Sequence, residues 1–339
     1  MKEKIRCFFN KKYVLYPLLV IFPVLVVFIS LFVGVYKLSG QEVLHAIFNP
    51  KSAASGTRII VWYLRFPRAM AAAFVGASLA VSGAAYQGVF RNPLVNSSML
   101  GVSNGAGFGA CLAIVAFGGG ASVYFSSFAF AILAVVLAWF AGRVYGRTSS
   151  VTLILGGVVV SAFFGALVSI MKYIADPYSQ LPGITFWFMG SFAETNYTHF
   201  YAFIPMAIGI LFIFLCKTRI NVLSIGDKEA QALGINVKLY KLLIVGGATL
   251  ATASAVSISG TIGWVGLVIP HIGRMLVGNN NSRLVPVSAS LGAVFLVIVD
   301  IICRSVTSSE LPIGIVTAII GTPFFVYLLK RTKGKQWNG

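Results

Sequence analysis

Residues 64–107 read LRFPRAMAAAFVGASLAVSGAAYQGVFRNPLVNSSMLGVSNGAG, and this stretch decides the fold class. Its centre is an apolar run of helix length built from Gly, Ala and Ser, with Arg65 and Arg68 at one end and Arg91 at the other. Small residues on an apolar helix let neighbouring backbones approach closely, which is how helices associate in lipid. The stretch therefore predicts a membrane-spanning helix that packs inside a bundle.

Composition extends this prediction to the whole chain. The hydrophobic share is 58%, the charged share is 10% and the mean hydropathy is +0.90. Long, nearly uncharged runs indicate spanning helices, and we expect ten of them. They lie at about 14–36, 61–85, 98–117, 121–142, 151–174, 200–216, 239–258, 262–277, 285–303 and 312–330. With no linker between them, residues 1–339 are expected to form one all-α transmembrane domain.

The net charge of +18 does not indicate a nucleic-acid partner, because the basic residues lie between apolar runs. Most of the 26 Lys and Arg residues fall on one side if the spans are numbered from an internal N-terminus. The excess of basic residues on cytoplasmic loops places both termini in the cytoplasm, with tails at 1–13 and 331–339. The first apolar run is too long for a secretory signal and is expected to be a retained anchor.

Catalytic signatures are missing from the sequence. The four cysteines are scattered singly, the three histidines are dispersed, and no phosphate-binding G-x-x-x-x-G-K-[ST] loop is present. We therefore expect no enzyme activity, no cofactor and no metal site. If ATP drives this protein, a different chain hydrolyses it.

The motifs L-R-x-P-R at Leu64 and R-N-P-L followed by L-G-V-S-x-G-A from Arg91 recur together in a known family. This wording resembles the permeases of iron-siderophore and cobalamin (FecCD-type) ABC importers. Two later segments, SGTIGWVGLVIPHIG from Ser259 and ELPIGIVTAIIGTPFF from Glu310, are similar to further family motifs. The resemblance implies the type II importer permease fold, with ten spans. It also implies a second permease copy or paralogue, two ATP-binding subunits and an extracytoplasmic substrate-binding protein.

A short internal sequence repeat is consistent with such a transporter. GASLAVSGA (residues 76–84) aligns without gaps on GATLATASA (residues 247–255). Spans 2 to 5 and 7 to 10 would then be inverted repeats, which transporters use to open to opposite sides. The alternative is that helices rich in Gly and Ala resemble one another by composition alone.

The longest predicted cytoplasmic loop, about 217–238, contains IGDKEAQALGIN. We expect Asp227 to cap a short helix over residues 228–233 and Gly234 to end it. The loop resembles the ATPase-coupling segment of the family at Glu229, Ala230, Leu233 and Gly234, so these residues with Asp227 form the predicted coupling site. An interfacial helix with its leucine side in the headgroups is the alternative.

The sequence around residues 259–278 suggests a span with one glycine face. Gly260, Gly263 and Gly266 recur every third residue, and Pro270 is expected to kink or end the span.

Four residues lie in loops near the predicted inner mouth and are candidates for a gate: Asn92, Leu94, Ser149 and Ser150.

Three arginines, Arg65, Arg68 and Arg304, lie at outer span ends. The resemblance implies that they receive acidic residues of the binding protein; snorkelling to lipid phosphates is the alternative. Asp300 is predicted to pair with Arg304, four residues along the same helix face. A proton-coupling role for Asp300 is the competing interpretation.

These predictions converge on one function. We expect a multi-pass permease in the cell membrane of a prokaryote that imports an iron(III)-siderophore with ATP hydrolysed elsewhere. A cobalamin or haem importer is the alternative within the same class. A self-contained, ion-coupled secondary transporter is the alternative from another class.

Overall fold

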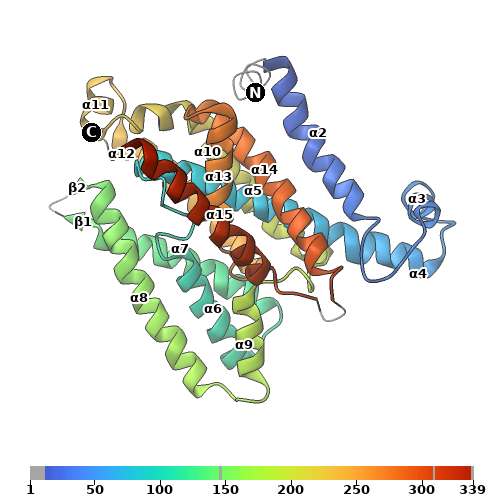
Figure 1. Cartoon of the computed structure of the whole chain (residues 1–339). Helices are drawn as coiled ribbons and strands as arrows, with labels where there is room; N and C mark the ends of the chain where they lie inside the picture. Colours follow the sequence, from blue (N-terminus) through green and yellow to red (C-terminus); the bar gives the residue numbers. More distant parts are fainter. Residues whose placement is uncertain (1–11, 145–146, 308–309, 337–339) are drawn as a thin grey trace.

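The computed structural model describes residues 12–144, 147–307 and 310–336 and is almost entirely helical (Figure 1). The first half contains α2 (Lys12–Ser30), α3 (Gly40–Phe48), α4 (Ser55–Arg58), the π-helix η1 (Ile59–Arg65), α5 (Phe66–Val89), α6 (Val102–Phe117), α7 (Ala121–Ala141) and α8 (Ser150–Ile174). The second half contains α9 (Gln180–Met189), the 3₁₀ helix η2 (Tyr197–Ala202), α10 (Phe203–Leu223), α11 (Asp227–Ala232), α12 (Val237–Ser259), α13 (Val265–Val277), α14 (Asn281–Cys303) and α15 (Ile313–Gln336). The antiparallel strands β1 (Arg143–Val144) and β2 (Arg147–Thr148) join α7 to α8.

Each predicted span coincides with a helix of the described chain. Within the described residues, six helical stretches are long and apolar enough to cross a membrane: 55–89, 121–141, 150–174, 197–223, 237–259 and 281–303. The helices at 17–30, 102–117, 265–277 and 313–327 are apolar but shorter. The all-helical membrane fold is thus confirmed, while the number of spans stays a prediction.

The helices α5 and α12 form the centre of the bundle. In each, 78% of the most apolar window is buried inside the protein, against 33% for α7 and α8. Small residues make this possible: an added Cβ at Gly76 would lie 2.1 Å from the Gly292 carbonyl oxygen of α14. The packing that residues 64–107 predict is therefore present.

The helices α5 and α12, which carry the two segments of the internal sequence repeat, lie against each other. The Ser82 hydroxyl of α5 donates to the Ala248 carbonyl of α12 at 3.2 Å, and the Tyr86 and Thr249 hydroxyls are 3.3 Å apart. The two similar segments therefore lie on two helices that are equally buried at the centre of the bundle. Their relation as inverted repeats stays a prediction.

The predicted span at 262–277 begins later than expected, and the prediction of one glycine face there is wrong. Helix α12 ends at Ser259, and helix α13 starts only at Val265. Gly260 and Trp264 have φ values of 66° and 69°, which interrupt a right-handed helix. Gly260 and Gly263 consequently lie in the break, and Pro270 lies inside α13 without ending it.

The bundle has two ends (Figure 1). We call the end that carries α11, the first turn of α2 and the last turns of α15 the α11 end, and the end that carries α3, α4 and α9 the α9 end. Helix α15 continues to Gln336 and so extends into the predicted tail at 331–339, whose cytoplasmic location stays a prediction. Most of the predicted N-terminal tail, residues 1–11, and residues 337–339 lie outside the described residues.

The basic-residue distribution yields a topology test. Ser224 and Tyr178 are exposed in connections at the α11 and α9 ends respectively. In a background without native cysteines, we expect Tyr178→Cys in intact cells to react with an impermeant thiol reagent. Ser224→Cys should react only after permeabilisation. Labelling of both sites from outside would contradict the predicted orientation.

Candidate functional site

The predicted coupling helix is present, but Asp227 does not cap it. Helix α11 starts at Asp227 after Gly226, which has a φ of 157° and makes no side-chain cap. The Asp227 carboxylate instead accepts a 2.6 Å bond from Lys241 Nζ. A bond to an ammonium is stronger than one to a neutral amide, which explains why the carboxylate turns away from the helix start.

Gly234 ends α11 as predicted. Its φ is 75°, in the left-handed region, and the Ile235 amide donates back to the Ala230 carbonyl at 3.0 Å. Ala230 is fully buried and fixes the inner face of the helix, whereas Leu233 is 65% exposed. The α11 segment therefore presents an apolar side chain on a short, fixed turn.

We expect Gly234→Val to disrupt this turn, because a β-branched residue rarely adopts a positive φ. No atom lies within 4 Å of an added Cβ, so the effect comes from backbone conformation and not from a clash. The loss should be about 1–3 kcal/mol, felt locally. ATPase association measured by co-purification should fall while membrane insertion is retained. Gly40→Val, at a negative φ with equally open space, is the matched control; unchanged association in Gly234→Val would remove α11 from coupling.

The four gate candidates gather at the α11 end, but they differ in role. Asn92 accepts the Leu94 amide at 2.9 Å, and Leu94 is 54% exposed. Ser149 caps α8 through a reciprocal pair of hydrogen bonds with Thr152. Ser150 is buried, and its hydroxyl donates to the Val89 carbonyl of α5 at 3.4 Å. The contact places the start of α8 beside the loop that carries Asn92 and Leu94.

The three predicted docking arginines come together at the α9 end, around a cavity of about 140 Å³. Their residues are only 4% to 8% exposed. Arg65 donates to the carbonyls of Leu31 and Tyr36, both at 2.6 Å, and Arg304 donates to the Ser30 carbonyl at 2.7 Å. These bonds tie the end of α2 and the segment that follows it to the bundle, and they give the two buried guanidinium groups hydrogen-bond acceptors.

The third arginine, Arg68, is shared by two carboxylates. Its Nε lies 2.7 Å from Oδ1 of the fully buried Asp300, and its Nη1 lies 2.8 Å from Oε2 of Glu310. The predicted pair of Asp300 and Arg304 is confirmed at 3.3 Å, although it lacks the alignment of a hydrogen bond. Three arginines and two carboxylates leave one positive charge in excess. The docking role stays a prediction, with the added condition that Arg68 already has partners.

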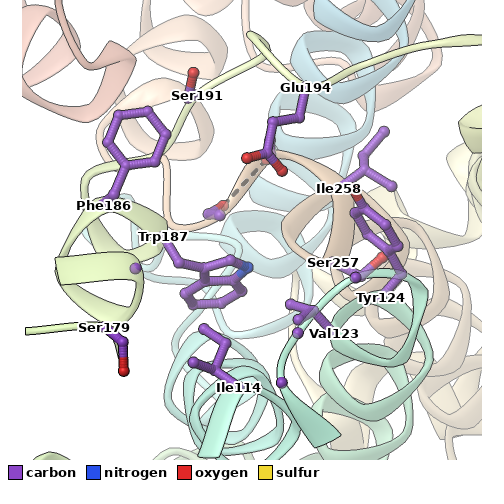
Figure 2. Close-up of a pocket in the computed structure, with 16 residues that line it drawn as sticks. Ile114, Val123, Tyr124, Ser179, Phe186, Trp187, Ser191, Glu194, Ser257 and Ile258 are labelled. Atoms are coloured by element: carbon purple, nitrogen blue, oxygen red, sulfur yellow. Dashed lines mark hydrogen bonds between the residues drawn. The ribbon is translucent and has the colours of Figure 1, made fainter. Parts of the chain in front are cut away.

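A larger cavity of about 290 Å³ lies at the α9 end between α6, α7, α9 and the end of α12. Figure 2 shows Glu194 and Trp187 pointing into it, with Tyr124 and Ile258 on the far wall. Among the described residues, the lining holds hydroxyl and aromatic groups and one carboxylate, but no Lys or Arg. Such a site suits a neutral or cationic ligand with apolar parts better than a small anion.

Two turns shape this cavity. Gly118, Gly119 and Gly120 form its rim with φ values of 73°, 90° and 72°, which only glycine adopts readily. Before α9, Asp176 accepts bonds from the hydroxyl and amide of Ser179, both at 2.7 Å. These bonds lower the pKa of Asp176 and keep it ionised, which fixes the start of α9.

Sequence reasoning missed this cavity and the role of Lys241. Glu194 and α9 lie in a stretch predicted only as a connection between spans. The sequence signal for Lys241 is a cation near the start of an apolar helix. Its partner Asp227, however, reads in sequence as the cap of α11. Among the described residues, no three His, Cys, Asp or Glu side chains gather as a metal site.

Comparison with known proteins covers nearly the whole chain. The sequence pattern of the FecCD transport family matches residues 20–331. The molybdate import system permease protein MolB of Haemophilus influenzae is 40% identical over 89% of this chain and 92% of its own length. A Helicobacter pylori protein, named as a probable iron chelatin transport system permease, is 39% identical over 90% and 95%. A solved structure, described as an inward-facing conformation of a metal-chelate type ABC transporter, superposes with a TM-score of 0.83 at 38% identity, covering 92% of this chain and 97% of that one.

Proposed function

This chain belongs to the FecCD transport family, and from that premise we propose that it imports an iron(III)-siderophore. It is a multi-pass ABC importer permease and not an enzyme. In our proposal ATP is hydrolysed by two separate subunits, a second permease copy or paralogue completes the pathway, and a binding protein delivers the cargo. The α11 end then faces the cytoplasm and the α9 end faces outward.

We infer the cargo from the residues that line the cavity at the α9 end. In the part of the chain that the structure describes, its lining has aromatic and hydroxyl groups and the Glu194 carboxylate, without a Lys or Arg. An iron(III) ion bound by three hydroxamates is neutral and has an organic shell, so it meets no repulsion there. Molybdate, the cargo in the name of one relative, is a small dianion that Glu194 would repel. Cobalamin and haem remain the alternatives within the class.

Uptake by the assembled importer tests this proposal. Vesicles holding the permease, its ATPase and its binding protein would receive iron(III)-trihydroxamate, cobalamin, haem or molybdate. We expect ATP-dependent accumulation of the iron complex alone. Glu194→Lys should leave uptake of the neutral iron complex nearly unchanged and should weaken the exclusion of molybdate, because a cation replaces the repelling carboxylate. Selective accumulation of molybdate, cobalamin or haem would overturn the assignment. Uptake that needs an ion gradient but no ATPase would instead support a secondary transporter.

Docking of the binding protein is proposed at the arginine cluster of the α9 end. Arg68 is 8% exposed, and Glu310, whose side chain is 34% exposed, covers its outer side. A carboxylate of an arriving protein would replace Glu310 on Arg68. Asp300 would meanwhile keep the inner side of the guanidinium neutralised.

This arrangement predicts an unusual direction of change. Glu310→Gln should tighten docking, up to about fivefold, because the competing carboxylate is lost while Arg68 keeps Asp300. The measurement is the Kd for the binding protein at low salt, and high salt should shrink the gain. Asp176→Asn removes the same charge at the same end, away from the cluster, and serves as the control. Weaker or unchanged docking of Glu310→Gln would speak against Arg68 as the receiving group.

A further inference from the structure

We propose that Lys241 is a positioning residue that transmits movement of α11 to the ends of α5 and α8 that flank the gate candidates. The inference rests on the proposed function, in which α11 docks against an ATPase. It assigns a role to a residue outside the predicted coupling motif. It is based on the position of the Lys241 ammonium, which belongs to α12 and bonds to side chains of two other helices, α8 and α11.

The contacts of Lys241 form a short chain. Its Nζ donates to Asp227 Oδ2 of α11 at 2.6 Å and to Ser150 Oγ of α8 at 3.3 Å. The Ser150 hydroxyl donates in turn to the Val89 carbonyl at the end of α5 at 3.4 Å. Lys241 itself lies in the first turn of α12. A displacement of α11 therefore reaches α12 and α8 through Lys241, and α5 through the Ser150 hydroxyl.

Burial makes this link stiff. Lys241 is only 5% exposed, so its ammonium has little access to water if Asp227 moves away. The second Asp227 oxygen, Oδ1, is buried and has no hydrogen-bond partner among the described residues. The Asp227 side chain is 31% exposed and can take water instead, so the cost of separating the pair falls on the Lys241 ammonium, which would be left buried without its counter-charge. The pair is expected to move as a unit.

The receiving helices are suited to respond. Only 33% of the α8 window is buried within this chain, against 78% for α5 and α12, so α8 is the less enclosed of these helices. Helix α12 runs without interruption from Lys241 to residues 257–259 in the wall of the outer cavity. Lys241 therefore lies near the α11 end of a helix whose other end lines the cavity of about 290 Å³.

The test follows the conformation of the gate loop instead of transport. Leu94→Cys, in a background lacking the four native cysteines, reports exposure of that loop in the complete complex. Its labelling rate is compared without nucleotide and after ATP hydrolysis in the presence of vanadate, which traps ADP in the ATPase. In otherwise unchanged protein, nucleotide should alter this rate. With Lys241→Met added, we expect the nucleotide-dependent change to fall about tenfold, while the ATPase still binds and hydrolyses ATP.

Matched variants separate transmission from folding. Lys238→Met, an exposed lysine of the same helix turn, should keep the full response. Lys241→Arg should restore a large part, since it returns the charge. The exchange Asp227→Lys with Lys241→Asp should restore some response that either single reversal lacks. A full response in Lys241→Met, or no recovery in Lys241→Arg, would overturn the proposal. Failure of the unmodified chain to bind any ATPase would instead overturn the proposed function.

Discussion

Asp300→Asn should lower the free energy of unfolding by about 3–5 kcal/mol, because it leaves two arginines without their buried counter-charge. Asp300 is fully buried and lies 2.7 Å from Arg68 Nε and 3.3 Å from Arg304 Nε. The asparagine keeps the shape of the side chain, so the loss reports charge and not volume. Unfolding of the purified protein in detergent, followed by denaturant or temperature, measures the change.

Glu310→Gln is the matched control for this prediction. It removes a carboxylate from the same Arg68, but at a side chain that is 34% exposed. Water replaces the lost partner there, so we expect about 0.2–1 kcal/mol. Equal losses in the two variants would mean that burial does not set the strength of the Asp300 pair. A negligible loss for Asp300→Asn would also argue that the carboxylate is protonated in the folded protein.

Gly83→Val should destabilise the bundle by at least about 1–3 kcal/mol and displace α13 from α5. An added Cβ at Gly83 would lie 1.8 Å from the Gly266 carbonyl oxygen. That oxygen is backbone and also accepts a bond from Gln87 at 3.3 Å, so it cannot simply rotate away. The thermal midpoint in detergent and the yield of folded protein measure the effect.

Gly246→Ala provides the contrast to this variant. Gly246 is a helical glycine of α12, and no atom lies within 4 Å of an added Cβ. The substitution should leave stability unchanged or raise it by up to about 1 kcal/mol, because alanine favours helix. If Gly83→Ala proves as harmless as Gly246→Ala, α5 and α13 are not held together by this close approach.

The sequence sufficed for several features that depend on one segment at a time. The ten apolar runs match helices, since length and hydropathy determine where a chain can cross lipid. The end of α11 at Gly234 was predictable because only glycine takes that left-handed turn readily. The pair of Asp300 and Arg304 follows from helical spacing alone. Motifs dispersed from Leu64 to the last helix were enough to indicate the family.

What the tertiary structure decided was the partner of each polar group. Asp227 reads as a helix cap in sequence, yet Lys241 lies fourteen positions along the chain and takes its carboxylate. In sequence, Arg65 and Arg68 have no internal partner, yet Leu31 binds Arg65, and Asp300 and Glu310 bind Arg68. Desolvation is the physical reason: a buried charge must take whichever opposite charge or carbonyl the fold brings nearest. That choice depends on packing between helices, which no local pattern encodes.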